Sequence, residues 1–93
     1  MIRPTERQDR MDKSIYSREY QAVLELLRDL RRESGITQVE LAKRLRLTQS
    51  LVSKIERGDR RLDIIELRSF CRAIGIGLTD FVSRLERELG KRA

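Results

Sequence analysis

The segment that most constrains the fold of this chain is residues 37–58, TQVELAKRLRLTQSLVSKIERG. Thr37 is a candidate N-cap with Glu40 three residues later, which is the spacing of a capping box. Apolar residues then recur at helical spacing. After a two-residue connection, Thr48 is a second candidate N-cap, and Gly58 suits the left-handed residue that ends a helix. The segment therefore predicts two short helices joined by a tight turn, which is the helix-turn-helix arrangement.

The second of these helices has two contrasting faces. At about 100° per residue, its apolar residues fall on one side: Leu51, Val52 and Ile55. The other side carries an amide, two hydroxyls and two cations but no carboxylate, namely Gln49, Ser50, Ser53, Lys54 and Arg57. Such groups contact base edges and phosphates in a DNA major groove. The pattern favours DNA recognition over the alternative, a solvated surface helix that happens to lack acid.

A wider pattern surrounds this motif, from Leu27 to Ile76. Its positions are Leu27, Leu30, Arg31, Thr37, Gln38, Leu41, Ala42, Leu45, Ser53, Ile55, Glu56 and Gly58. In residue type and spacing the chain resembles the lambda-repressor-like helix-turn-helix family (Cro/repressor type, XRE). One position departs from the family pattern, because Leu62 stands where a proline often precedes the fourth helix. The resemblance implies an all-α fold of five helices and a sequence-specific regulator of transcription.

The rest of the chain completes this all-α domain. Helical periodicity predicts helices over 17–34, 38–45, 49–57, 64–74 and 80–89, and no strand. Thr79 is the expected cap of the last helix and Gly90 its expected end. We divide the chain into a flexible polar N-terminal arm, 1–15, and a helix-turn-helix DNA-binding domain, 16–90, which includes a C-terminal dimerisation helix.

Composition narrows the class of protein. The chain has 93 residues, a net charge of +6 and a pI near 10.2, which fits a single basic domain that binds nucleic acid. An acidic protein partner or a membrane surface would fit the charge equally well. The absence of His and the presence of one Cys, Cys71, predict no metal site, no cofactor and no enzymatic activity. Without a signal peptide or a membrane-length apolar run, we expect a cytoplasmic protein with no membrane partner.

The resemblance assigns roles to single residues. Gln49, Ser50 and Lys54 occupy the family's base-contacting positions. We expect phosphate contacts from Gln38, Thr48, Ser53, Arg57, Arg60 and Arg61, although Ser53 could equally fill space near the turn and each arginine could serve solubility. In the family, Gln38 also braces the first residue of the recognition helix. Arg31 and Glu56 match a structural pair that joins the first helix to the end of the recognition helix.

An apolar stripe follows the fourth helix and continues along the last one. It comprises Ile76, Leu78, Phe81, Val82, Leu85 and Leu89. Part of this stripe must cover the first helix, and a chain this small leaves the remainder exposed, as at many interfaces. The stripe predicts a two-fold homodimer, with recognition helices about 34 Å apart to match successive major grooves.

Three functions fit these features. The first is a transcriptional regulator, a repressor, that binds an inverted-repeat operator in double-stranded DNA as a homodimer; a restriction–modification controller is one variant. The second is the antitoxin of a toxin–antitoxin pair, which would add a toxin as protein partner. The third is a protein-interaction module that has lost DNA binding. Such a module should carry acidic or bulky apolar residues on the recognition face, and this face has neither at Gln49, Ser50, Ser53 and Lys54.

Overall fold

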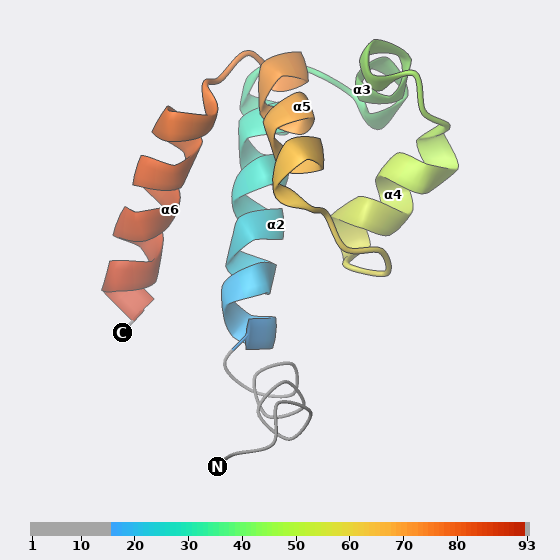
Figure 1. Ribbon diagram of the computed structural model, residues 1–93. Helices are drawn as coiled ribbons and strands as arrows, with labels where there is room; N and C mark the ends of the chain where they lie inside the picture. Colours follow the sequence, from blue (N-terminus) through green and yellow to red (C-terminus); the bar gives the residue numbers. More distant parts are fainter. Residues whose placement is uncertain (1–15, 93) are drawn as a thin grey trace.

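The computed structural model describes residues 16–92, and within them every regular element is a helix and none is a strand. Five helices follow one another (Figure 1): α2 (Tyr16–Glu33), α3 (Gln38–Leu45), α4 (Gln49–Arg57), α5 (Ile64–Ile74) and α6 (Leu78–Arg92). The bounds of α3, α4 and α5 agree with the predicted ranges, and α2 is displaced by one residue. The predicted all-α fold is confirmed. The predicted N-terminal arm, 1–15, lies outside the described residues.

Helix α2 is the central support of the fold. It packs against α4, α5 and α6, while α3 packs against α4 and α5. In Figure 1, α6 lies on one side of α2 and the α3–α4 pair lies on the other. This pair is the helix-turn-helix unit, and it stands at the edge of the molecule in that view.

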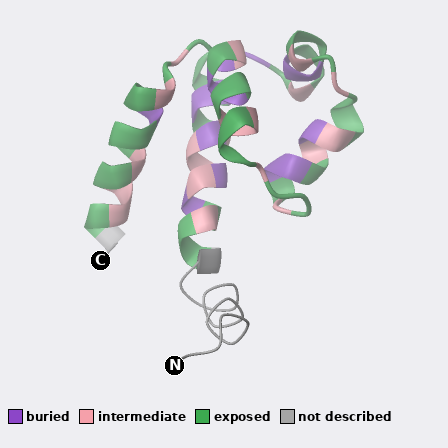
Figure 2. Ribbon diagram, in the orientation of Figure 1, coloured by how far each residue is buried: buried purple, intermediate pink, exposed green. Residues whose placement is uncertain are grey.

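The apolar core draws on every described helix. Figure 2 shows the buried segments turned toward the interior. The largest fully buried side chains are Leu24, Leu41, Val52, Ile55, Cys71 and Phe81. Because each helix contributes at least one of them, the position of α4 is fixed by contacts with the rest of the domain rather than by its own short length.

Side-chain caps start three of the helices where the sequence places them. The Thr37 and Thr48 hydroxyls accept from the backbone N–H groups of Glu40 and Leu51, each at 3.1 Å. Asp63 forms a complete capping box, because the Glu66 side chain also accepts from the Asp63 N–H. The box expected at Thr37 is only half formed. The Glu40 carboxylate instead accepts from Arg44 Nε, one turn further along α3, at 3.4 Å.

The last helix is longer than predicted at both ends. It begins at Leu78, so Thr79 lies inside it and is not the cap. The N–H of Phe81 donates to the Gly77 carbonyl at 3.0 Å, which extends the helical bonding back to Gly77. At the other end the helix passes through Gly90 to Arg92. Gly90 is not in the left-handed conformation that ends a helix, so it costs helix stability without stopping the helix.

Candidate nucleic-acid interface

Helix α4 separates its apolar and polar faces as the sequence predicts. Val52 and Ile55 are buried in the core and Leu51 is partly buried. The polar side chains stay at the surface: Gln49, Ser50, Lys54 and Arg57 are exposed and Ser53 is half-buried. Thr48, the cap, is also exposed. The side chains proposed to contact bases therefore share one accessible face of a helix that the core holds from behind.

The turn before α4 depends on an unusual backbone conformation at Arg46. This residue ends α3 with φ 57° and ψ 41°, in the left-handed region. The next N–H, of Leu47, donates to the Ala42 carbonyl at 2.9 Å and closes the end of α3. Within residues 16–92, the other positive-φ residues are Gly35, Gly58 and Gly75. An L-residue with a side chain is strained in this conformation, so the turn is set by tertiary packing rather than by the preference of Arg46.

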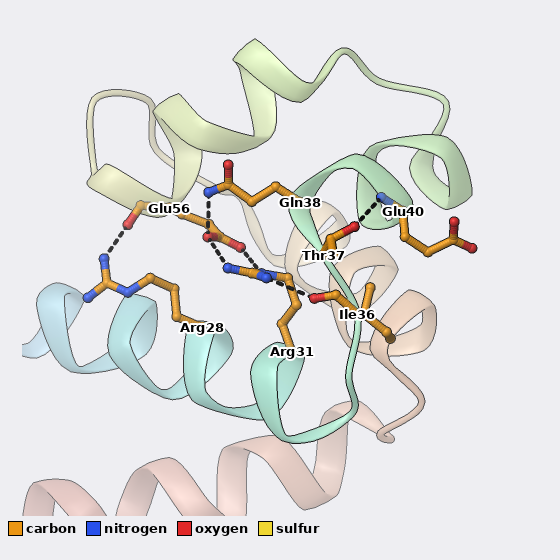
Figure 3. Close-up of polar contacts among 7 residues, drawn as sticks. All are labelled: Arg28, Arg31, Ile36, Thr37, Gln38, Glu40 and Glu56. Atoms are coloured by element: carbon orange, nitrogen blue, oxygen red, sulfur yellow. Dashed lines mark hydrogen bonds and ion pairs between the residues drawn. The ribbon is translucent and has the colours of Figure 1, made fainter.

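A buried ion pair fastens the end of α4 to α2 (Figure 3). Arg31 Nε lies 2.7 Å from Glu56 Oε2, and Arg31 Nη2 donates to Glu56 Oε1 at 3.0 Å. The two side chains are only 8% and 6% exposed. Arg31 Nη1 also donates to the Ile36 carbonyl at 2.8 Å. The pair is thus bidentate and further hydrogen-bonded, the condition under which a buried pair is tolerated.

Two further side chains converge on Glu56. Arg28 Nη1 donates to the Glu56 carbonyl at 2.8 Å, which satisfies an oxygen in the last turn of α4. Gln38 Nε2 donates to Glu56 Oε1 at 2.9 Å. Because a carboxylate only accepts, this contact directs the Gln38 amide nitrogen toward Glu56 and its oxygen away from it (Figure 3). Within residues 16–92 no hydrogen bond joins Gln38 to Gln49, the contact expected from the resemblance. The resemblance did not point to the contacts that Gln38 and Arg28 make with Glu56.

The three arginines expected at phosphates all have partners within the chain. Arg57 donates to Ser53 Oγ at 2.6 Å and pairs with Asp59 at 3.1 Å. Arg60 pairs with Glu66 at 2.7 Å, and the Arg61 guanidinium lies 5.4 Å from the centre of the Tyr20 ring. The ion pairs are at the surface, where such pairs contribute little. Exchanging them for a phosphate therefore costs little free energy.

The Arg60 partner is held in its ionised form. Hydrogen bonding to the backbone of Asp63, and then to Arg60, lowers the pKa of Glu66 below its ordinary value. The carboxylate is therefore charged at neutral pH. It serves both the cap of α5 and the orientation of Arg60, so the loop between α4 and α5 is ordered around it.

Cys71 has no features of a reactive site. It is fully buried, and burial raises the pKa of its thiol to about 11, so the nucleophilic thiolate is scarce at neutral pH.

Among residues 16–92 no group of His, Cys, Asp and Glu is placed to hold a metal ion. In the same part of the chain, no helix has the length and hydropathy required to cross a membrane.

The predicted dimer stripe is only partly accessible. Phe81 is fully buried under the chain's own helices and belongs to the core. Ile76, Leu78, Leu85 and Leu89 are half-buried. Val82 is the most exposed of the set, at 39%. The surface available to a second copy is therefore the part of the stripe that remains exposed once Phe81 is excluded.

Comparison with known proteins agrees with this geometry. A family model described as helix-turn-helix matches residues 27–81, which is more than half of the chain. The chain belongs to the helix-turn-helix family. Within this family it is similar to an uncharacterised HTH-type transcriptional regulator of Sinorhizobium fredii, 37% identical over 54 residues that cover 58% of this chain and 70% of the relative.

Solved structures place the chain within the XRE branch of helix-turn-helix proteins. An XRE-family like protein from Pseudomonas syringae pathovar tomato is 50% identical, with a TM-score of 0.77 over 82% of this chain and 93% of that one. The wild-type restriction-modification controller protein C.Esp1396I is 28% identical, with a TM-score of 0.71 over 76% of this chain and 93% of that one. This helix-turn-helix protein is thus of a DNA-binding regulator type.

Proposed function

We propose that this helix-turn-helix protein is a sequence-specific transcriptional regulator that binds an inverted-repeat operator in double-stranded DNA as a homodimer and acts as a repressor. The observation that carries the proposal is the exposed, acid-free polar face of α4. This face is fixed from behind by the core and at its end by the Arg31–Glu56 pair. A rigid helix with a polar outer face is the device by which this motif enters a major groove.

Base recognition in this proposal comes from Gln49, Ser50 and Lys54. All three are exposed, and within residues 16–92 none of their side chains has a hydrogen-bond or ion-pair partner. A glutamine amide matches the N6 and N7 of adenine, and a lysine matches the O6 and N7 of guanine. Ser50 tolerates either base. These side chains are free to bond to DNA without breaking a contact in the protein.

Phosphate binding comes from residues that surround α4. The proposed set is Gln38, Thr48, Ser53, Arg57, Arg60 and Arg61. Because Gln38 Nε2 carries a second N–H besides the one directed at Glu56, it retains a donor for a phosphate. Arg57 and Arg60 exchange surface ion pairs for DNA phosphates, with release of counterions from the duplex.

The dimer in this proposal forms through the outer edge of the apolar stripe, at Val82, Leu85 and Leu89 with Ile76 and Leu78. These side chains keep exposed surface in the single chain, and an isologous contact on α6 closes after two copies. A dimer presents two α4 helices to one face of DNA about 34 Å apart. An operator occupied in this way is closed to other proteins, which is the physical basis of repression.

A restriction–modification controller is a more specific version of this function. The observation in its favour is the similarity to C.Esp1396I, a restriction-modification controller protein that matches three-quarters of this chain. Restriction and methyltransferase genes beside the gene for this chain would support this version, and a toxin gene there would support the antitoxin alternative.

Selection of bound duplexes from a random DNA pool tests the proposed function. We expect enrichment of an inverted repeat whose half-sites are centred about 10 base pairs apart, one helical turn, or a multiple of that spacing. A transcription assay with the selected duplex placed over a promoter should then show reduced transcript. Failure to enrich any sequence over the starting pool would reject sequence-specific binding.

A further inference from the structure

The loop that carries Arg60 and Arg61 is attached to α2 at its beginning. The loop leaves α4 at Gly58, whose φ is 87°. A Cβ at this position would lie 3.2 Å from Leu24 Cδ1 and 3.3 Å from Gln21 Nε2. Such distances are tighter than ordinary van der Waals contact, so the Gly58 backbone lies directly against the Gln21 and Leu24 side chains of α2.

The same loop is attached to α2 again at its end. The N–H of Leu62 donates to the Tyr20 hydroxyl oxygen at 2.8 Å, in a partly buried position and across 42 residues of sequence. The next residue, Asp63, caps α5. The hydroxyl therefore accepts from a backbone N–H in the loop between α4 and α5, where helical hydrogen bonds do not satisfy the backbone. Residues 59–61 form a short bridge between two anchored ends.

The ring of Tyr20 also contacts one of the arginines on this bridge. The Arg61 guanidinium carbon lies 5.4 Å from the centre of the ring, within the range of a cation–π contact. One side chain thus holds both the backbone of the loop, through its hydroxyl, and the Arg61 guanidinium, through its ring. Tyr20 itself is half-buried on α2.

We propose that Tyr20 is a positioning residue for DNA backbone binding: it holds the loop and Arg61 in the arrangement that meets the phosphates. The proposal rests on the proposed function and adds a residue that neither the sequence motif nor the predicted site includes. Arginine on a mobile loop loses conformational freedom when it binds. Because Tyr20 already restrains Arg61 in the free protein, part of this conformational entropy is lost before DNA binds. Because phosphates carry no sequence information, its effect is on affinity for any duplex.

Two substitutions separate the two contacts. Tyr20→Phe keeps the ring and removes the acceptor for the Leu62 N–H, and Tyr20→Leu removes both. We expect Tyr20→Phe to weaken binding by at most about fivefold, the full effect of one hydrogen bond, on the selected duplex and a scrambled duplex alike. Tyr20→Leu should weaken both further and reduce the slope of log affinity against log salt toward that of Arg61→Ala. In Tyr20→Phe, the amide of Leu62 should exchange its hydrogen faster.

A double-mutant cycle distinguishes positioning from simple support of the fold. With Arg61→Ala already present, Tyr20→Leu should cost less affinity than it costs in the wild-type chain, because the contact between the ring and the guanidinium is already absent and only the loss of the Leu62 hydrogen bond remains. Ala22→Gly is the matched control: Ala22 is buried in the same helix, and glycine there weakens the helix without touching the loop.

Stability and DNA binding of the tyrosine variants together decide whether Tyr20 positions Arg61. Equal losses of stability in Tyr20→Leu and Ala22→Gly, with only Tyr20→Leu weakening the folded protein's DNA binding, would support it. Unchanged binding in both tyrosine variants, or full additivity with Arg61→Ala, would overturn it. If the wild-type chain itself bound neither duplex at low salt, the proposed function would fail instead.

Discussion

Arg46 shows how a single residue can oppose the turn in which it lies. The sequence places Arg46 in the connection between two helices, but nothing in the local pattern requires a left-handed residue there. The three-dimensional structure does require a left-handed residue at this position. The N–H of Leu47 donates to the Ala42 carbonyl while the Leu47 side chain packs against the core. Arginine disfavours the left-handed conformation that Arg46 adopts, so the packing of the surrounding residues, rather than the residue type, determines the backbone conformation here.

Replacing Arg46 with glycine should stabilise the fold. Glycine relieves a left-handed strain of about 1 kcal/mol but adds freedom to the unfolded chain worth about 0.4–1 kcal/mol. We expect Arg46→Gly to raise the free energy of unfolding by a few tenths of a kcal/mol, measured by urea denaturation. Arg46→Ala is the control and should give no gain, because it keeps the Cβ. A clear loss of stability in Arg46→Gly would show that the turn is not strained.

Several side-chain contacts at the residue scale could not be predicted from sequence. The Arg31–Glu56 contact followed from the family resemblance. The contacts of Gln38 with Glu56 and of Leu62 with Tyr20 join residues 18 and 42 positions apart. Periodicity reports which face of a helix is apolar, but it does not report which polar side chains from two helices will meet.

At the scale of elements, predicted caps and predicted glycine ends both hold for the inner helices and both fail at α6, where Thr79 lies inside the helix. Thr37, Thr48 and Asp63 each accept the backbone N–H that defines a cap. Gly58 and Gly75 end helices in the left-handed conformation. Gly90 does not, because a glycine ends a helix only where the chain turns away, and α6 continues.

The two kinds of glycine give a matched test. No atom within 4 Å obstructs a Cβ at either Gly75 or Gly90, but only Gly75 has a positive φ, of 99°. Gly90→Ala should therefore raise the free energy of unfolding, by at most about 1 kcal/mol near a helix end. Gly75→Ala should lower it by about 1 kcal/mol or more. Thermal denaturation of both variants measures this. Equal shifts would contradict the assigned backbone conformations.

At the scale of the whole molecule, the fold supports one polar face and leaves one apolar edge. The polar face of α4 is fixed by α2 through Glu56, and α6, the helix that carries Val82, lies on the other side of α2 (Figure 1). A dimer built on α6 would therefore leave both recognition faces uncovered. This arrangement supports the proposed homodimer without any contact between the two copies of α4.

Disruption of the exposed edge should separate the dimer into monomers. Val82→Glu places a charge at the most exposed position of the stripe. Burying an unpaired charge in an interface is costly, so we expect the dimer dissociation constant to rise at least about tenfold, with little change in the helical circular dichroism. Ser83→Glu, about 100° around α6, is the control. Sedimentation at micromolar concentration measures both, and a monomeric wild-type chain would refute the dimer.

In the proposed mode of binding, α4 contacts bases and the loop after it contacts phosphates. Titration of four single variants against the selected and scrambled duplexes, at two salt concentrations, separates the two kinds of contact. Gln49→Ala and Lys54→Ala should each cost about 1–3 kcal/mol on the selected duplex and far less on the scrambled one. Arg60→Ala and Arg61→Ala should weaken both duplexes alike and lower the salt slope by about one unit each. If Gln49→Ala and Lys54→Ala weakened the two duplexes equally, α4 would not be the recognition helix.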